Sequence, residues 1–219
     1  YVFTTHGELR SFLKKQIGSI GLVPTMGALH KGHLSLVQKA AENNNWVLVS
    51  IFINPTQFNN ANDLTKYPKN TAKDLELLTP YNTKLIVYTP DDSDLYPKAI
   101  NAKKYNFGSL AEHMEGAFRD NHFNGVATVI EALFRNLKPD RAYFGEKDFQ
   151  QLQVIRALAR DLSMAVKVHG VSTERETSGL AMSSRNGYLT DTEKATASAI
   201  FAEMQRLKAG IESGNTDFV

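Results

Sequence analysis

Two histidines three residues apart, His30 and His33, are the first residues of the chain whose types and spacing suggest chemistry. They end the segment Pro24-Thr25-Met26-Gly27-Ala28-Leu29-His30-Lys31-Gly32-His33, which lies between an apolar run and an amphipathic pattern and predicts strand, tight loop and helix. Gly27 and Gly32 let the backbone approach a ligand, and the helix start offers N–H groups to an anion. This arrangement favours a polyphosphate over the helix, with imidazoles donating to oxygens that gain charge as a bond breaks.

The same histidines have two other interpretations, a metal site and a purely structural role. A lone H-x-G-H sequence is a weak signal, so the tetrapeptide alone leaves both open. The metal interpretation finds no support elsewhere, because the sequence has no cysteine and no H-E-x-x-H pattern.

Two further places in the sequence could bind an anion. Lys147 follows a predicted strand and precedes a predicted helix, which would direct its ammonium group to the same polyphosphate. Ser183-Ser184-Arg185 combines two hydroxyls with a guanidinium fork that matches phosphate oxygens. The alternatives are a solvated surface lysine and a simple turn ahead of a helix.

Alternating apolar and amphipathic stretches predict the elements that must position these residues. Strands are expected at 20–23, 46–53, 84–88, 140–144 and 165–171, with a short edge strand at 104–107; helices are expected at 71–78, 126–137, 149–162 and 191–209, and a loop at 59–63. This alternation predicts a parallel sheet with helices on both faces. Ligands bind such sheets beyond the carboxyl ends of the strands, where the loops 25–33, 54–57 and 145–148 fall.

The texture of the sequence changes after Val171. Residues 172–185 are polar, and a long helix capped by Thr190 or Asp191 follows. We therefore expect one domain over 1–171 and the beginning of a second over 172–219. The second is expected to be incomplete, because 210–219 is too short to finish a globular domain.

The composition fits a folded protein with a proper core. Of the 219 residues 42% are hydrophobic, which argues against disorder, and the net charge of +2 is too small to indicate nucleic acid or membrane as a partner. The absence of cysteine excludes disulfides and catalytic thiols and fits a cytoplasmic protein. No apolar run approaches the roughly 20 residues of a membrane span.

Five motifs in order resemble the pantothenate synthetase family, also called the pantoate-beta-alanine ligases. They are Gly21-Leu22-Val23-Pro24-Thr25-Met26-Gly27-Ala28-Leu29-His30-Lys31-Gly32-His33, Ser50-Ile51-Phe52-Ile53-Asn54-Pro55-Thr56-Gln57-Phe58, Tyr67-Pro68, Phe144-Gly145-Glu146-Lys147-Asp148-Phe149-Gln150-Gln151-Leu152 and Ser183-Ser184-Arg185-Asn186-Gly187-Tyr188-Leu189. The resemblance implies a Rossmann-like nucleotidyltransferase domain with a smaller carboxyl-terminal lid, incomplete in this chain, in a cytoplasmic homodimer. It also implies that ATP and (R)-pantoate give pantoyl adenylate and pyrophosphate, after which beta-alanine displaces AMP to give pantothenate.

The resemblance also implies the site residues. The catalytic residues would be His30, His33 and Lys147. The ATP-binding residues would be Pro24, Met26, His30, His33, Gly145, Lys147, Asp148, Met182, Ser183, Ser184 and Arg185. The pantoate-binding residues would be Met26, Asn54, Gln57 and Gln151. Glutamine suits a carboxylate ligand because its amide donates and accepts without adding negative charge.

Asp74 is a candidate for holding the Mg²⁺ that accompanies ATP, and a solvent-facing helix carboxylate is the alternative. The sequence departs from the family at Arg119-Asp120-Asn121-His122-Phe123, which in the family usually reads R-P-G-H-F. The loss of that rigid turn leaves open whether the segment serves a dimer edge or a substrate loop.

Two other functions compete with the ligase. A cytidylyltransferase or phosphopantetheine adenylyltransferase also carries H-x-G-H but would lack the paired glutamines Gln57 and Gln151. A catalytically inactive nucleotide-binding regulator would have lost charge-stabilising residues, whereas His30, His33, Lys147 and Arg185 are all present.

Overall fold

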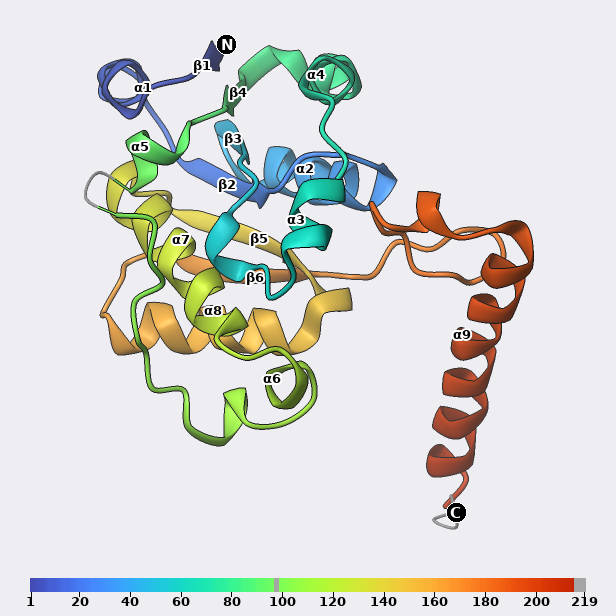
Figure 1. Ribbon diagram of the computed structural model, residues 1–219. Coiled ribbons are helices and arrows are strands. Elements are labelled where there is room, and N and C mark those ends of the chain that lie inside the picture. Colours follow the sequence, from blue (N-terminus) through green and yellow to red (C-terminus); the bar gives the residue numbers. More distant parts are fainter. Residues whose placement is uncertain (97–98, 215–219) are drawn as a thin grey trace.

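The computed structural model describes residues 1–96 and 99–214. Six parallel strands form one sheet in the order β1-β4-β3-β2-β5-β6 (Figure 1). Their bounds are Val2–Phe3 for β1, Ile20–Thr25 for β2, Trp46–Ile51 for β3, Leu85–Tyr88 for β4, Arg141–Gly145 for β5 and Lys167–Val171 for β6. The predicted α/β fold with a parallel sheet is confirmed.

The strand order changes direction at β2. From β2 the chain adds β3 and then β4 on one side, and it returns to add β5 and β6 on the other side. A doubly wound sheet has its ligand crevice at such a point, beyond the carboxyl ends of the two central strands. The crevice is therefore expected beyond the ends of β2 and β5.

Helices cover both faces of the sheet, and alternate side chains of each central strand supply the two cores. Val23 and Val49 pack with Val37 on one face, whereas Leu22 and Leu48 contribute to the opposite core. The first face carries α2 (Lys31–Asn43) and α4 (Thr71–Leu78); the second carries α1 (His6–Leu13), α7 (His122–Leu137) and α8 (Phe149–Asp161). The helices that follow β2 and β5 thus lie on opposite faces.

Short helices join these elements. They are α3 (Ala61–Lys66), α5 (Asp92–Leu95), α6 (Glu115–Phe118) and the 3-10 turns η1 (Pro55–Gln57), η2 (Thr79–Lys84), η3 (Gly108–Ala111), η4 (Glu146–Asp148) and η5 (Asn186–Tyr188). Helix α3 corrects the predicted loop at 59–63, because the side chain of Asn60 caps a new helix turn by accepting from the N–H of Asn62.

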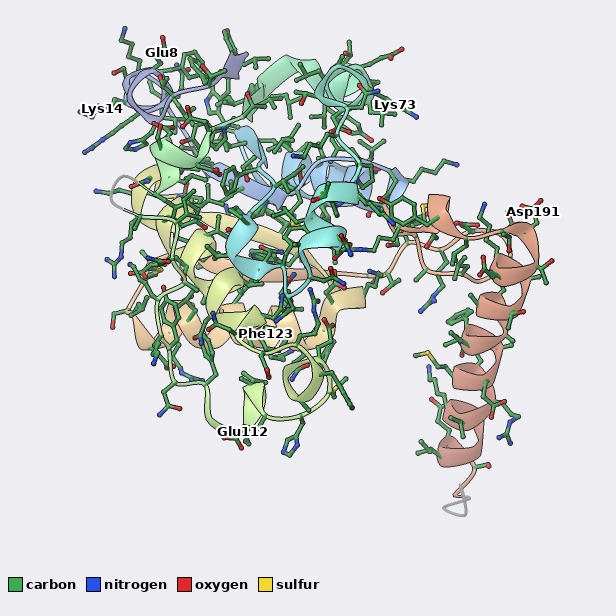
Figure 2. All side chains as sticks on the ribbon, viewed as in Figure 1. Glu8, Lys14, Lys73, Glu112, Phe123 and Asp191 are labelled. Carbon is green, nitrogen blue, oxygen red and sulfur yellow. The ribbon has the colours of Figure 1, made fainter. Side chains whose placement is uncertain are left out.

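The last helix, α9 (Asp191–Glu212), extends away from the sheet (Figure 1). The helix begins with a capping box between Thr190 and Glu193, and Thr190 is one of the two caps expected from the sequence. None of its described residues is buried, unlike those of the helices on the sheet. Charged side chains such as Glu8, Lys14 and Lys73 extend outward from the surface (Figure 2). No helix in the described ranges is both long and apolar enough to span a bilayer.

The predicted edge strand at 104–107 is wrong. The backbone N–H groups of Lys103 and Tyr105 donate to the side chains of Thr128 and Asn124 on α7, at 2.8 and 2.9 Å. Backbone groups that find side-chain partners on a helix have no need of a neighbouring strand. The segment is therefore an extended tether along α7.

Glu131 fastens the same tether to α7. Its side chain is only 7% exposed and accepts from Lys103 and Tyr105 of the tether and from Arg135 one turn along the helix. Burial by itself raises the pKa of Glu131, but these hydrogen bonds outweigh burial and lower the pKa to about 2. The carboxylate is therefore charged when folded, and its contribution to stability is present above its ordinary pKa of 4.5.

We predict that Glu131→Gln lowers the free energy of unfolding at pH 7 by about 1–3 kcal/mol. Lys103, Tyr105 and Arg135 all donate to the carboxylate, and the NH₂ group of glutamine would face one of these donors without being able to accept from it. The parent protein should lose more stability than the variant as the pH falls from 4.5 toward 2. Urea unfolding at several pH values measures both effects. Glu203→Gln, in an exposed ion pair of α9, is the control; equal losses in the two variants would contradict the prediction.

Candidate functional site

One pocket lies where the crevice is expected, beyond the ends of β2 and β5. It gathers side chains from the loop after β2, from η1, from the β5–α8 junction and from the segment before η5. All the predicted ATP and pantoate residues line it, namely Pro24, Met26, His30, His33, Asn54, Gln57, Gly145, Lys147, Asp148, Gln151, Met182, Ser183, Ser184 and Arg185. Residues far apart in the sequence thus share one pocket; their chemical roles stay predictions.

The imidazoles of His30 and His33 have defined hydrogen-bonding roles. Nδ1 of His30 accepts from the backbone N–H of Gly32 at 3.1 Å, and Nδ1 of His33 accepts from the N–H of His30 at 3.3 Å. An accepting Nδ1 carries no proton, so the neutral ring holds its proton on Nε2. Each histidine therefore keeps one N–H for a ligand.

Both imidazoles are neutral in the folded protein. Burial, followed by the charges of the neighbouring His30 and Lys147, lowers the pKa of His33 to about 3. Burial, followed by the charge of Lys147, also lowers the pKa of His30. Since neither pKa lies above its ordinary value of 6.5, the pair offers donors without fixed positive charge at neutral pH.

The N-terminus of α2 adjoins the two imidazoles. His30 is the N-cap residue, and it forms a capping box with His33. Gly32 makes this possible, because a Cβ at that position would lie 2.9 Å from Cε1 of His30. The positive end of the helix dipole therefore lies beside the two imidazoles, which favours an anion there, while the N–H groups of Gly32, His33 and Leu34 already have partners within the turn.

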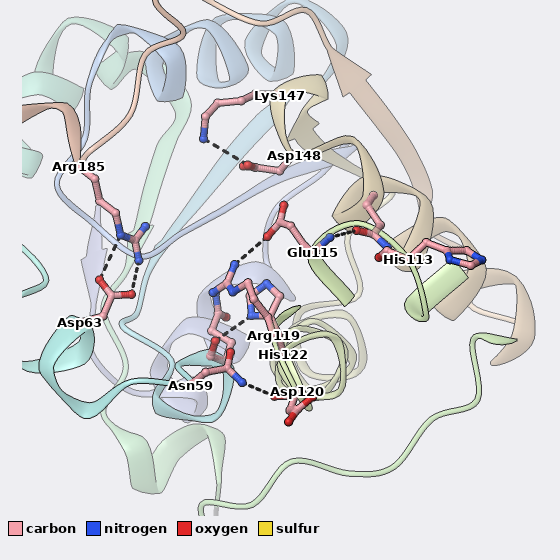
Figure 3. A network of polar contacts seen from close by, with 12 residues as sticks. Asn59, Asp63, His113, Glu115, Arg119, Asp120, His122, Lys147, Asp148 and Arg185 are labelled. Carbon is pink, nitrogen blue, oxygen red and sulfur yellow. Dashed lines mark hydrogen bonds and ion pairs between the residues drawn. The ribbon is translucent and has the colours of Figure 1, made fainter. Parts of the chain in front are cut away.

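Lys147 supplies the positive charge of the pocket wall at the end of β5. Its ammonium group donates to Asp148 at 3.2 Å, and both side chains are 39% or more exposed (Figure 3). Such an exposed pair is weak and leaves the lysine able to exchange its partner for a ligand phosphate.

Asn54 and Gln57 form the opposite part of the pocket. Asn54 is 1% exposed, and its Nδ2 donates to Oε1 of Gln57 at 2.8 Å and to the carbonyl of Gly125 at 3.1 Å. Its Oδ1 accepts from Thr56 and Tyr96. Because Oε1 of Gln57 accepts from Asn54, the amide NH₂ of Gln57 remains to donate to a ligand. Asn54 thus serves the pocket chiefly by orienting Gln57.

Gly125 brings α7 against η1 and so fixes the position of Gln57. A Cβ on Gly125 would lie 2.1 Å from the carbonyl oxygen of Thr56, which no real side chain tolerates. His122, on the same helix, is 4% exposed and hydrogen-bonds the carbonyl of Gln57 through Nδ1 at 2.8 Å. Because a carbonyl only accepts, Nδ1 of His122 carries the proton and its Nε2 is an acceptor.

The segment from Arg119 to Phe123 belongs to the pocket wall. Arg119 donates to Glu115 at 2.8 Å, and Arg119, Glu115 and His122 all line the pocket (Figure 3). Asn121 takes the left-handed conformation, with φ of 61°, which asparagine adopts more readily than most residues. The chain therefore turns at Asn121 without the proline and glycine of R-P-G-H-F, and the role of the segment stays a prediction. Sequence reasoning had noticed this segment but not assigned Glu115 or His122 to the site.

Asp74 lies under the loop after β2 and outside the pocket lining. Its side chain is buried, and its two oxygens accept from the backbone N–H groups of Ala28 at 3.0 Å and Leu29 at 2.7 Å. The solvent-facing alternative is wrong, because the side chain of Asp74 is buried, whereas Lys73 on the same helix extends outward (Figure 2). Asp74 instead holds Ala28 in its left-handed conformation, with φ of 51°.

The site does not form a protein cage for magnesium. Within residues 1–96 and 99–214, no three side chains of His, Asp or Glu gather where they could hold a metal ion. Asp74 directs both oxygens to backbone donors, and Asp148 accepts from Lys147. The donor set thus does not fit a protein-held ion, and Asp74 as a magnesium ligand stays a prediction without geometric support.

The fold and the site together define a class of protein. A doubly wound parallel sheet, an anion site at a helix N-terminus and a pocket with two neutral imidazoles, a lysine and amide side chains are typical of enzymes that bind nucleotides beyond the strand ends.

Comparison with known proteins gives the family. Residues 1–218 match the model of the pantoate-beta-alanine ligase family, and the chain belongs to this family of ligases. It is 57% identical to the pantothenate synthetase of Alteromonas mediterranea over 201 residues, which are 91% of this chain and 71% of that protein.

Two solved structures share the fold. The pantothenate synthetase of Thermus thermophilus is 41% identical with a TM-score of 0.91, and the match covers 97% of this chain and 76% of that one. The pantoate-beta-alanine ligase of Francisella tularensis, described as complexed with beta-gamma ATP and beta-alanine, is 38% identical with a TM-score of 0.87; the match covers 92% of this chain and 77% of that one. The chain thus spans about three quarters of the length of these relatives.

We predict that Asp74→Asn lowers the free energy of unfolding by about 1–3 kcal/mol. The side-chain NH₂ of asparagine would lie against the backbone N–H of Ala28 or Leu29, and two donors cannot form a hydrogen bond. Glu76→Gln, exposed on the same helix, is the control and should change little. Urea unfolding measures both. If Asp74 served magnesium instead, stability would be retained and the magnesium dependence of ATP consumption would shift, an outcome that would contradict a structural role for this carboxylate.

Proposed function

We propose that this protein joins (R)-pantoate to beta-alanine at the expense of ATP and so forms pantothenate. Membership of the pantoate-beta-alanine ligase family supports this reaction. The observation that carries it is the pocket itself, in which two Nε2–H donors, a lysine and the N-terminus of α2 face the same space as the free amide of Gln57.

The reaction would proceed in two steps through an acyl adenylate. A carboxylate is a poor electrophile, so amide formation in water requires a better leaving group. The pantoate carboxylate oxygen attacks the α-phosphorus of ATP, and the bond from that phosphorus to the bridging oxygen breaks to release pyrophosphate. The amine of beta-alanine, after losing its ammonium proton, then attacks the acyl carbon and AMP leaves.

The first step needs charge stabilisation more than covalent chemistry. In phosphoryl and nucleotidyl transfer the protein mainly positions the reactants and stabilises the charge that develops on phosphate oxygens. Lys147 and Arg185 would supply positive charge, and His30 and His33 would donate from Nε2 without needing to be protonated. Gln57 and Gln151 would hold the hydroxyls and carboxylate of pantoate, and Asp148 the ribose.

Magnesium is proposed to reach the site on the phosphates of ATP. Mg²⁺ commonly keeps several waters and binds mainly through substrate phosphates in nucleotide sites, where it offsets their negative charge. This proposal agrees with a pocket that holds no three-residue acidic or histidine cluster among the described positions.

We also propose that residues 1–171 form the nucleotide and pantoate domain, and that residues from 172 onward begin a lid. None of the described residues of α9 is buried, which supports this division. Ser184 donates to the carbonyl of Ala28 at 3.0 Å, so the segment before η5 reaches the loop after β2, as a lid would. The homodimer and the cytoplasmic location stay predictions.

Product analysis tests the reaction directly. The protein would be mixed with Mg-ATP and (R)-pantoate, with and without beta-alanine. We expect pyrophosphate only when pantoate is present, and free AMP only after beta-alanine is added. Pyrophosphate formed without pantoate would indicate another nucleotidyltransferase, and ATP binding without consumption would indicate an inactive nucleotide-binding protein.

We predict that Lys147→Ala slows pyrophosphate formation by roughly a hundredfold to a thousandfold, as the loss of one partner of transition-state charge typically does. Lys39→Ala, which removes an exposed ion pair on α2, is the control and should leave the rate unchanged. Single-turnover assays with saturating Mg-ATP and pantoate measure the step. A near-normal rate in Lys147→Ala would remove this lysine from the proposed mechanism.

A further inference from the structure

Arg185 is held by a residue that sequence reasoning did not assign to the site. Its Nε and Nη2 donate to the two carboxylate oxygens of Asp63 on α3, at 3.1 and 2.8 Å (Figure 3). The two residues are 122 positions apart in sequence, and they join the segment before η5 to the wall formed by α3. Figure 3 shows this pair in the same view as Lys147 and Asp148, which also line the pocket.

The pair contributes little to folding. The side chains of Arg185 and Asp63 are 41% and 35% exposed, and pairs with this exposure typically contribute only about 0.2–1 kcal/mol. The hydrogen bonds from Arg185 nevertheless lower the pKa of Asp63, so the carboxylate is charged at neutral pH. The significance of the pair therefore lies in where it places the guanidinium group.

The geometry leaves one edge of the guanidinium available. A guanidinium has five N–H donors, and the side-on pair with Asp63 uses one on Nε and one on Nη2. Within the described part of the chain, Nη1 has no hydrogen-bond partner. Arg185 lines the pocket, so this edge can donate to a ligand while Asp63 keeps the other edge.

Tyr67 restricts the remaining freedom of the guanidinium. The Cζ atom of Arg185 lies 5.2 Å from the centre of the Tyr67 ring, within the range of a cation–π contact. The ring of Tyr67 is buried against the protein, whereas Tyr188 ties the same segment to α3 by donating to the carbonyl of Lys66. Two contacts, the Asp63 carboxylate and the Tyr67 ring, therefore restrict the position of the guanidinium group.

We propose that Asp63 is a positioning residue for the ATP triphosphate. It holds Arg185 side-on so that the Nη1 edge faces the phosphates, and Arg185 binds carboxylate and phosphate at the same time. This inference rests on the proposed function, because it requires a triphosphate in the pocket. If the Asp63 carboxylate instead competed with the phosphates for Arg185, removing its charge would strengthen ATP binding. The two roles of Asp63 are therefore distinguishable by the direction of the change in affinity.

Equilibrium binding of two nucleotides to the intact chain tests the proposal. The probes are adenosine 5′-(β,γ-methylene)triphosphate, which has the full triphosphate, and AMP, which lacks the two outer phosphates. We expect Asp63→Asn to weaken binding of the triphosphate about tenfold and to leave AMP affinity unchanged. Asp63→Glu, which keeps the charge, should restore part of the loss. Asp161→Asn, in an exposed pair on α8, is the matched control.

A double-mutant cycle with Arg185→Ala shows whether Asp63 acts through Arg185. Coupled residues give non-additive effects, so Asp63→Asn should cause no further loss in the Arg185→Ala background. Equal loss for AMP and triphosphate, additive losses, or tighter binding by Asp63→Asn would each overturn the proposal. If the unmodified protein bound no triphosphate, the ATP site itself would be wrong; if it bound triphosphate but formed no pyrophosphate, only the proposed reaction would fail.

Discussion

The reversal of strand order between β2 and β5 is the constraint on which the site depends. The helices that follow these neighbouring strands lie on opposite faces of the sheet, so no helix crosses the space beyond the two strand ends. Residues after β2 and after β5 therefore face each other across a crevice. The opening follows from the right-handed connections of a parallel sheet and does not depend on which side chains line it.

Around this crevice the backbone determines most of the side-chain chemistry. The turn into α2 supplies the two N–H groups that occupy Nδ1 of His30 and His33, and burial keeps both rings neutral. The site thereby gains two donors that carry no fixed positive charge at neutral pH. Lys147 and Arg185, which come from different segments of the chain, contribute positive charge to this pocket.

Much of this architecture could be predicted from the sequence, because its strands are continuous apolar runs between turn residues. The helix over Thr71–Leu78 and the strands around the crevice were predicted to within a few residues. The residues of the pocket were found through the five family motifs, since no periodicity joins His30 to Arg185. Short elements failed: 104–107 was expected as a strand, although side chains of α7 provide its hydrogen-bond partners.

The burial of Asp74 and the partner of Asp63, neither of which the sequence indicated, have a common physical origin. A carboxylate gives no local sign of whether it faces solvent, backbone donors or a distant guanidinium. Asp74 finds the N–H groups of Ala28 and Leu29, and Asp63 finds Arg185 far along the chain. These partners are determined by tertiary packing, which a single sequence does not reveal.

Gly125 shows what such close packing implies for the evolution of the protein. Glycine in the middle of a helix is less favourable than alanine by about 1 kcal/mol, so α7 gives up helix stability at this position. The absence of a side chain there lets α7 lie against η1 and hold the turn that carries Gln57. A change that improves the helix in isolation would displace a residue that touches the pocket. The position therefore represents a local trade-off between stability and activity.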